Sequence, residues 1–175
     1  MDASVLSGWE NFYVIVGSSA GGLTGLTFVV IALIRDVSKV SPTGVGAFVT
    51  PTIVHFGGVL AMAAFMSIPH QHLATLSAGF AVAGVAGLIY TGSIVRGMRA
   101  QAPSYMPVWE DWLFNAIVPG LVYAGLVLLA RLLWRYTEQS LFAVAGMSLI
   151  MLFVGIHNAW DIAVWMTTRS APPKG

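Results

Sequence analysis

A histidine and a carboxylate, His157 and Asp161, stand one helical turn apart near the C-terminal end of the sequence. They lie in the stretch GIHNAWDIAVW, which is otherwise apolar enough to cross a membrane. Helical residues four apart lie above one another, so the carboxylate can accept from one imidazole nitrogen and fix the tautomer. An ionisable group in hydrocarbon costs at least about 2.5 kcal/mol, and such groups mark candidate functional sites.

A second histidine, His55, follows a proline in the stretch FVTPTIVHFGG. Pro51 cannot donate to the carbonyl of Ala47, which predicts a helix break or kink at the proline. Interrupted helices of this kind line binding cavities in transporters, although an ordinary proline kink is the simpler interpretation. At about 1.5 Å per residue, His55 and His157 lie about 17 and 14 Å from the same membrane surface, so we expect them at a similar depth.

Two asparagines extend this candidate cluster. Asn158 lies three residues before Asp161, and Asn115 lies in the preceding apolar segment. Three interpretations of the cluster remain open. It is a hydrogen-bonded network that holds helices together, a pathway for a proton or another ion, or a site of metal or haem ligation.

Metal or haem ligation would depend on the two histidines. His55 and His157 could be axial ligands on facing helices, but two histidines are also common without a cofactor. The absence of cysteine excludes disulfides, iron–sulfur clusters and cysteine nucleophiles. No cofactor is predicted, and a haem or metal ion stays an alternative.

The composition indicates that the whole chain is embedded in a lipid bilayer. Of its 175 residues, 57% are hydrophobic and 9% are charged, whereas soluble domains contain about 25% charged residues. The formal net charge is +1 and there is no basic tract, so nucleic acid is not an expected partner. We predict a single domain, residues 1–175, that folds as an all-α polytopic membrane bundle.

A spanning helix needs about 20 mostly apolar residues. Five segments meet this length: Phe12 to Ile34, Gly44 to Ser67, Leu73 to Val95, Leu113 to Trp134 and Leu141 to Met166. The longest connection, Arg96 to Trp112, carries tryptophans and acidic residues typical of a membrane surface. Because Pro119 favours a first helical turn, residues 108–118 could instead form an interfacial helix before a later fourth span.

The basic residues predict an orientation in the membrane. On one side of the predicted spans lie Arg35, Lys39, Arg96, Arg99, Arg169 and Lys174, and on the other lie Arg131 and Arg135. The positive-inside rule places the first group in the cytoplasm. We therefore expect a multi-pass protein of the bacterial inner membrane, with its N-terminus outside and its C-terminus inside.

Small residues recur every four positions in two of the predicted spans. They are Gly17, Gly21 and Gly25 in the first span, and Gly79, Ala83 and Gly87 in the third. Such stripes let helices approach closely, because lipid offers no hydrophobic drive for association. Packing within one chain is the simpler expectation, and a seam between subunits of a homo-oligomer is the alternative.

Several motifs resemble a group of small bacterial multi-span membrane proteins that has no established activity. The motifs are WENFYV and GSSAGGLTGL at the start, PTIVHF around His55, and HNAWD around Asp161. They extend over nearly the whole chain. The resemblance implies a bacterial multi-span protein and assigns no catalytic role.

Three classes of function follow from these observations. The first is an oligomeric channel or transporter for an ion, a proton or a small solute, using the intramembrane His/Asp cluster. The second is a haem- or metal-binding redox protein, and the third is a non-catalytic accessory subunit of a larger membrane complex. Catalysis is less expected, because no nucleophile is singled out by its surroundings.

Overall fold

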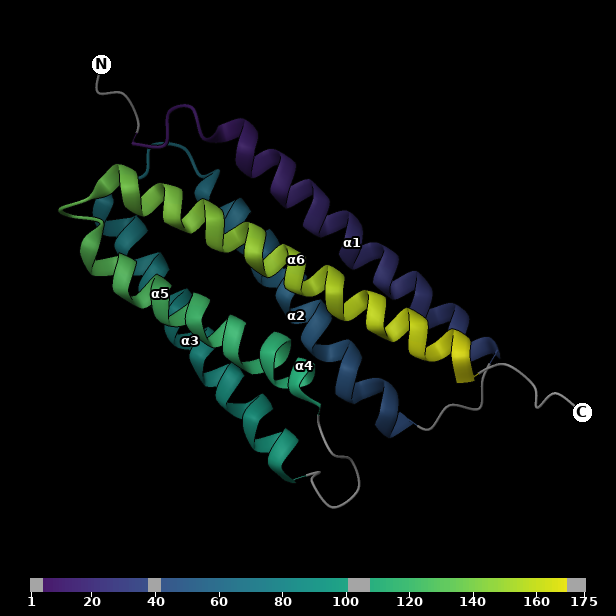
Figure 1. Cartoon of the computed structure of the whole chain (residues 1–175). Helices are drawn as coiled ribbons and strands as arrows, with labels where there is room; N and C mark the ends of the chain where they lie inside the picture. The colour runs from purple at the N-terminus through teal and green to yellow at the C-terminus, as the bar shows by residue number, and fades with distance from the viewer. Residues whose placement is uncertain (1–4, 38–41, 101–107, 170–175) are drawn as a thin grey trace, which may run out of the picture.

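The computed structural model describes residues 5–37, 42–100 and 108–169, which are almost entirely helical (Figure 1). No strand occurs in this part of the chain. The elements, in order, are α1 (Glu10–Val37), α2 (Pro42–Met66), α3 (Leu73–Ala100), α4 (Trp109–Trp112), the π-helical segment η1 (Leu113–Ile117), α5 (Val118–Leu132) and α6 (Thr137–Arg169).

The helices have the length and composition of membrane spans. In the described residues, four stretches are long and apolar enough to cross a bilayer: Glu10–Ala32, Leu73–Ala100, Trp109–Leu132 and Thr137–Val164. A shorter apolar stretch, Thr50–Met66, belongs to α2. The prediction of an all-helical bundle is confirmed, and by composition the chain is a multi-pass membrane protein.

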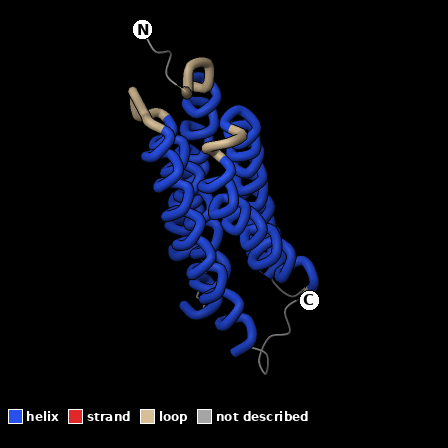
Figure 2. The backbone as a smooth tube through the Cα atoms, turned by 90° about the vertical axis from the view of Figure 1, so that its left-hand side faces the viewer, coloured by secondary structure: helices blue, strands red, loops and turns tan. Residues whose placement is uncertain are grey.

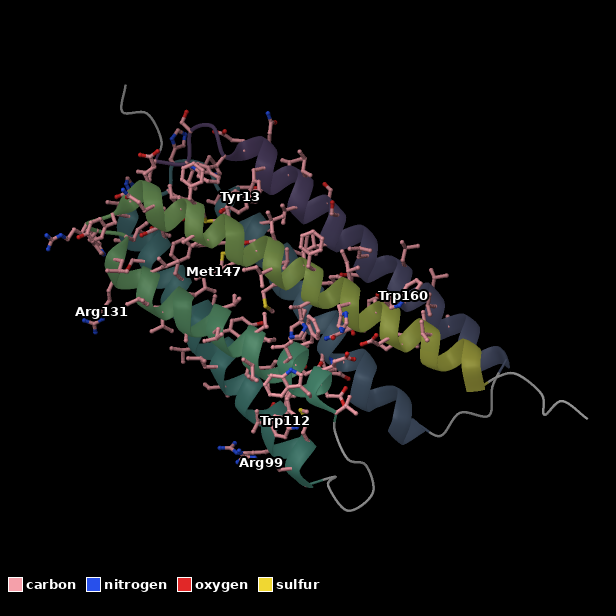
Figure 3. All side chains as sticks on the ribbon, viewed as in Figure 1. Tyr13, Arg99, Trp112, Arg131, Met147 and Trp160 are labelled. Carbon is pink, nitrogen blue, oxygen red and sulfur yellow. The ribbon has the colours of Figure 1, made fainter. Side chains whose placement is uncertain are left out.

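The long helices alternate in direction, so that one end of the bundle holds the start of α1 and the other holds the end of α6 (Figure 1). Arg131 marks the first end and Arg99 the second, with Trp112 near Arg99 (Figure 3). We call these the Arg131 end and the Arg99 end. Figure 2 shows the same helices turned by 90°, as roughly parallel rods joined by loops.

The helices form two groups that meet along α6. In one group α2 lies between α1 and α6, and in the other α3 packs along α5. Direct contact of α5 with α6 joins the two groups. Four helices, α2, α3, α5 and α6, consequently surround the middle of the bundle.

The fourth apolar helix begins earlier than the sequence predicts. Residues 109–112 are helical, whereas we expected them in the connection that follows the third span. The Asp111 carboxylate accepts a hydrogen bond of 3.0 Å from the backbone N–H of Val108, which caps the first turn. Helical structure then continues to Leu132, so residues 109–118 belong to this helix and do not form a separate interfacial one.

Several of the small residues lie where two helices pack closely, so that a larger side chain would not fit. A Cβ at Gly17 would lie 3.0 Å from the Cβ of Ala63 on α2. A Cβ at Gly79 would collide with the ring of Phe65. These glycines therefore serve packing within the chain. A Cβ at Gly21 would lie 3.9 Å from Cδ1 of Leu60, which is ordinary contact, and a Cβ at Gly25 would meet no described atom within 4 Å.

At Gly84, α3 lies directly against the backbone of α5. A Cβ there would lie 2.7 Å from the backbone carbonyl oxygen of Tyr123 and 2.9 Å from the backbone nitrogen of Val127. Backbone atoms cannot move aside as a flexible side chain can. We expect Gly84→Ala to lower the free energy of unfolding by about 1–3 kcal/mol, the usual cost of overpacking.

Gly92 on the same helix supplies the matched control, because no described atom lies within 4 Å of its Cβ position. Gly92→Ala should be neutral or raise stability by up to about 1 kcal/mol through helix propensity. Titration with denaturing detergent in mixed micelles measures both values. Equal stabilities of the two variants would contradict the close approach of α3 and α5.

Candidate functional site

The helix that carries Asn115 widens just before a proline. Pro119 lacks an N–H and cannot bond to the carbonyl of Asn115. The preceding turn is π-helical, and the N–H of Val118 bonds instead to the carbonyl of Leu113. Segments of this kind are rare and occur frequently at functional sites.

Two asparagines join this widened turn to α6. The side-chain nitrogen of Asn158 donates to the side-chain oxygen of Asn115 over 3.1 Å. The nitrogen of Asn115 in turn donates to the backbone carbonyl of Asp111 over 3.1 Å. Asn158 is 7% exposed, so its hydrogen bond to Asn115, which we call the asparagine clamp, is largely buried. The structure brings together the two asparagines that the sequence grouped in one cluster.

His157 and Asp161 also lie together, toward the outside of the bundle. The Nε2 atom of His157 is 3.3 Å from Oδ2 of Asp161, without hydrogen-bond alignment. The imidazole lies over the ring of Phe114, with 3.7 Å between ring centroids. The histidine side chain is 33% exposed and the carboxylate 57%. The carboxylate is therefore exposed at the surface of the bundle, whereas the Nε2 atom of the imidazole is buried.

His55 occupies a different environment. It is 1% exposed, and its Nδ1 atom has no hydrogen-bond partner among the described residues. Its neighbour Phe56 packs against Gly155, which places His55 and His157 at similar levels, as their spacing predicted. No hydrogen bond joins the two histidines in the part of the chain that the structure describes. Pro51 lies inside α2, which continues on both sides of it, so the helix does not break at the proline as the sequence had suggested.

His55 faces a cavity that the sequence did not predict. The cavity has a volume of about 550 Å³ and lies between α2, α3, α5 and α6. Its walls are mostly aliphatic, aromatic and methionine side chains, and the polar residues among them are His55, Tyr90, Tyr123 and Ser148. Ala83 and Gly87 of the small-residue stripe on α3 also line it.

The polar groups of the cavity differ in how they are satisfied. The hydroxyl of Ser148 donates to the carbonyl of Val144 over 2.9 Å. The hydroxyl of Tyr90 is buried and, like Nδ1 of His55, has no partner among the described residues. Leaving such groups unpaired costs about 1–3 kcal/mol each. Neither atom is exposed to the space inside the cavity, so the accessible lining of the cavity is almost wholly apolar.

The cavity opens sideways between α2 and α3. Four of its lining residues are also exposed on the outer surface of the bundle: Gly58 and Ala61 on α2, and Val82 and Ala86 on α3. In a membrane this surface meets hydrocarbon. A lipid-soluble molecule can therefore reach the cavity without crossing water.

The sequence matches no known family model, and neither a curated protein nor a solved structure is significantly similar to it. Among the described residues, no group of three or more His, Cys, Asp or Glu side chains is placed to hold a metal ion. The class that the fold and site define is an all-helical protein with the composition of a multi-pass membrane protein and an apolar cavity that opens on one side.

Proposed function

We propose that this chain binds a small, mostly apolar molecule inside its helix bundle, as the binding step of solute uptake or transfer in the membrane. The cavity of about 550 Å³ is the observation that carries the proposal. Its volume falls within the range of small-molecule sites, about 300–1,000 Å³, and such sites combine apolar walls with a few polar groups.

Packing argues for a site with an occupant rather than for a loose core. Protein interiors contain few voids larger than a water molecule, because unfilled space costs stability. Elsewhere in this bundle the packing is tight, as at Gly84, where α3 meets the backbone of α5. Small residues such as Ala83 keep the cavity open next to this contact.

Binding of a neutral ring compound to the intact protein tests the proposal. The probe is durene, a tetramethylbenzene, and the protein is held in lipid nanodiscs. Equilibrium dialysis of labelled durene, after subtraction of protein-free nanodiscs, should show saturable binding of about one molecule per chain, since the cavity has the volume of one small-molecule site. Uptake equal to that of protein-free nanodiscs would contradict the proposal.

Proton passage is a second proposal, and the arrangement of His157 and Asp161 favours it. The carboxylate is exposed, and the half-buried imidazole lies 3.3 Å from it, so the pair makes a first step from the surface inward. A continuous conducting path would form between subunits of a homo-oligomer, since one bundle of apolar spans offers little polar lining. The cytoplasm would lie at the Arg99 end in the orientation we propose.

Flux measurements test this second function. We expect Asp161→Asn and His157→Ala to lower proton flux into proteoliposomes about tenfold or more, because each removes a proton-carrying group. Glu138→Gln, an exposed change in the first turn of α6 at the opposite end, is the control and should leave flux unchanged. Wild-type flux in both site variants would contradict proton passage through this pair.

A further inference from the structure

The cavity lies in the half of the bundle toward the Arg131 end. On α2, which runs toward that end (Figure 1), its lining residues begin with Val54 at the middle of the helix and finish with Phe65 beside the last residue. On α6, which starts at the Arg131 end, they lie between Val144 and Met151, in the first half of the helix. The cavity therefore begins close to one membrane surface and finishes near the middle of the bundle.

The cavity is long in the direction of the helices. Its lining extends from Val54 to Phe65 on α2 and from Gly79 to Tyr90 on α3, which in each case is about 16 Å at 1.5 Å per residue. The hydrocarbon core of a bilayer is about 30 Å thick, so one leaflet supplies about 15 Å of it. The length and position of the cavity thus match the hydrocarbon of a single leaflet.

The surface that the cavity offers to an occupant is apolar. None of the described lining residues is Asp, Glu, Lys or Arg, and Nδ1 of His55 and the hydroxyl of Tyr90 are buried away from its space. An ionised group would lose its hydration there without gaining a partner, which is strongly unfavourable. Met62, Met147 and Met151 line the cavity, and flexible methionine side chains adapt to the shape of what they contact. These walls are suited to a hydrocarbon of variable shape.

Small side chains edge the opening between α2 and α3. Gly58 and Ala61 of α2, and Val82 and Ala86 of α3, line the cavity and are exposed on the outer surface. In a bilayer, the molecules that meet this surface are lipids. Their tails are as apolar as aliphatic side chains, so a tail can enter without a change in hydration. The charged headgroup can stay at the membrane surface.

We infer that the cavity takes one hydrocarbon tail of a membrane lipid from the leaflet at the Arg131 end, with the headgroup outside the bundle at that surface. This inference rests on the proposed function and specifies its ligand, since the apolar molecule is then a lipid of the bilayer. Tail carbons near the headgroup lie beside Phe65, and the terminal methyl lies toward Val54. The gain comes from filling the cavity, because unfilled space loses packing contacts.

Photochemical labelling of the intact protein in phosphatidylcholine nanodiscs locates the tail. One probe is a phosphatidylcholine with a diazirine near the end of one tail, and the other carries the diazirine near the ester. On illumination the diazirine loses nitrogen, and the carbene inserts into a neighbouring C–H bond. Mass spectrometry of peptides should find the first probe on Met151, which is 4% exposed and lines the cavity. The second probe should label Phe65 in preference to Met151.

Two variants narrow the opening. Ala61→Phe and Ala86→Phe each place a ring at one edge of it, on α2 and α3 respectively. Each should lower the labelling of Met151 at least about fivefold, because the ring and the tail compete for the same space. Ala64→Phe, at an exposed alanine of α2 outside the cavity, is the matched control and should be labelled as the wild type is.

Three results would overturn the inference. The first is labelling confined to the outer surface of the helices, and the second is labelling of Met151 that persists in both Ala61→Phe and Ala86→Phe. The third is the reverse pattern of the two probes, which would place the tail in the other leaflet. Saturable durene binding in the same nanodiscs would still support the proposed function in each case. Absence of both Met151 labelling and durene binding would overturn the two proposals together.

Discussion

Replacing Ala83 with phenylalanine is expected to abolish the saturable binding of durene. Ala83 is half-buried on α3, one turn before Gly87, and lines the apolar part of the cavity. The added ring and the probe compete for the same volume in a close-packed interior. The affinity should fall by a factor of about 30 or more, which corresponds to about 2 kcal/mol of binding free energy.

A second blocking variant covers the case in which the ring introduced by Ala83→Phe turns away from the cavity and leaves it open. Val59 lies on α2, is buried and lines the same cavity. Val59→Phe should reduce binding as Ala83→Phe does, because it fills the cavity from α2 rather than from α3. Ala124→Phe places the same ring at an exposed position of α5 outside the cavity, and binding there should equal that of the wild type.

Equilibrium dialysis in nanodiscs measures all four proteins under one condition. Thermal unfolding checks that each variant retains its fold, so that loss of binding reflects the blocked cavity. Wild-type affinity in both Ala83→Phe and Val59→Phe would show that durene binds elsewhere. A comparable loss of durene binding in Ala124→Phe would show that an added ring weakens binding wherever it is placed.

Among the polar contacts described above, the hydrogen bond between Asn158 and Asn115 should contribute most to stability. In Asn158→Leu the side-chain oxygen of Asn115 loses its donor at a half-buried position within the π-helical turn. Hydrogen bonds between membrane helices contribute about 1–2 kcal/mol in peptides, and an orphaned buried acceptor costs about 1–3 kcal/mol. We expect the free energy of unfolding to fall by about 1–2 kcal/mol.

A double-mutant cycle separates this hydrogen bond from its surroundings. Asn115→Leu and Asn158→Leu should be non-additive by about 0.5–1.5 kcal/mol, because either change alone breaks the same contact. Asn11→Leu, at an exposed residue of α1, should shift stability by no more than about 0.5 kcal/mol. Additive effects in the cycle would contradict a direct bond between the two asparagines.

The sequence predicted the helices well because apolar length decides where a chain can span a membrane. The predicted spans from Phe12, Gly44 and Leu73 overlap α1, α2 and α3 over most of their lengths. The predicted and observed helices differ at their ends, where local capping hydrogen bonds decide the first and last helical residue. The carboxylate of Asp111 caps the helix at Val108 and extends it into the predicted connection. The π-helical turn went unpredicted, although Pro119 is the residue that favours it.

The candidate site was predictable in its local contacts and not in its cavity. His157 and Asp161 lie together because a four-residue spacing fixes that contact within one helix. The cavity depends on which faces of four helices meet, and uniformly apolar segments carry no periodicity that reveals those faces. Tyr90 and Tyr123 were missed for this reason, although a tyrosine hydroxyl inside an apolar span is a polar signal of the same kind as His55.

Locating a heavy-atom probe inside the bundle tests the central claim most directly. Bromine in the dibromo derivative of durene gives an anomalous signal in crystals of the intact protein. Binding inside the bundle predicts bromine peaks in the cavity, beside its lining residues Met62 and Tyr123. Peaks confined to the outer, lipid-facing surface of the helices, with the cavity empty of bromine, would contradict it.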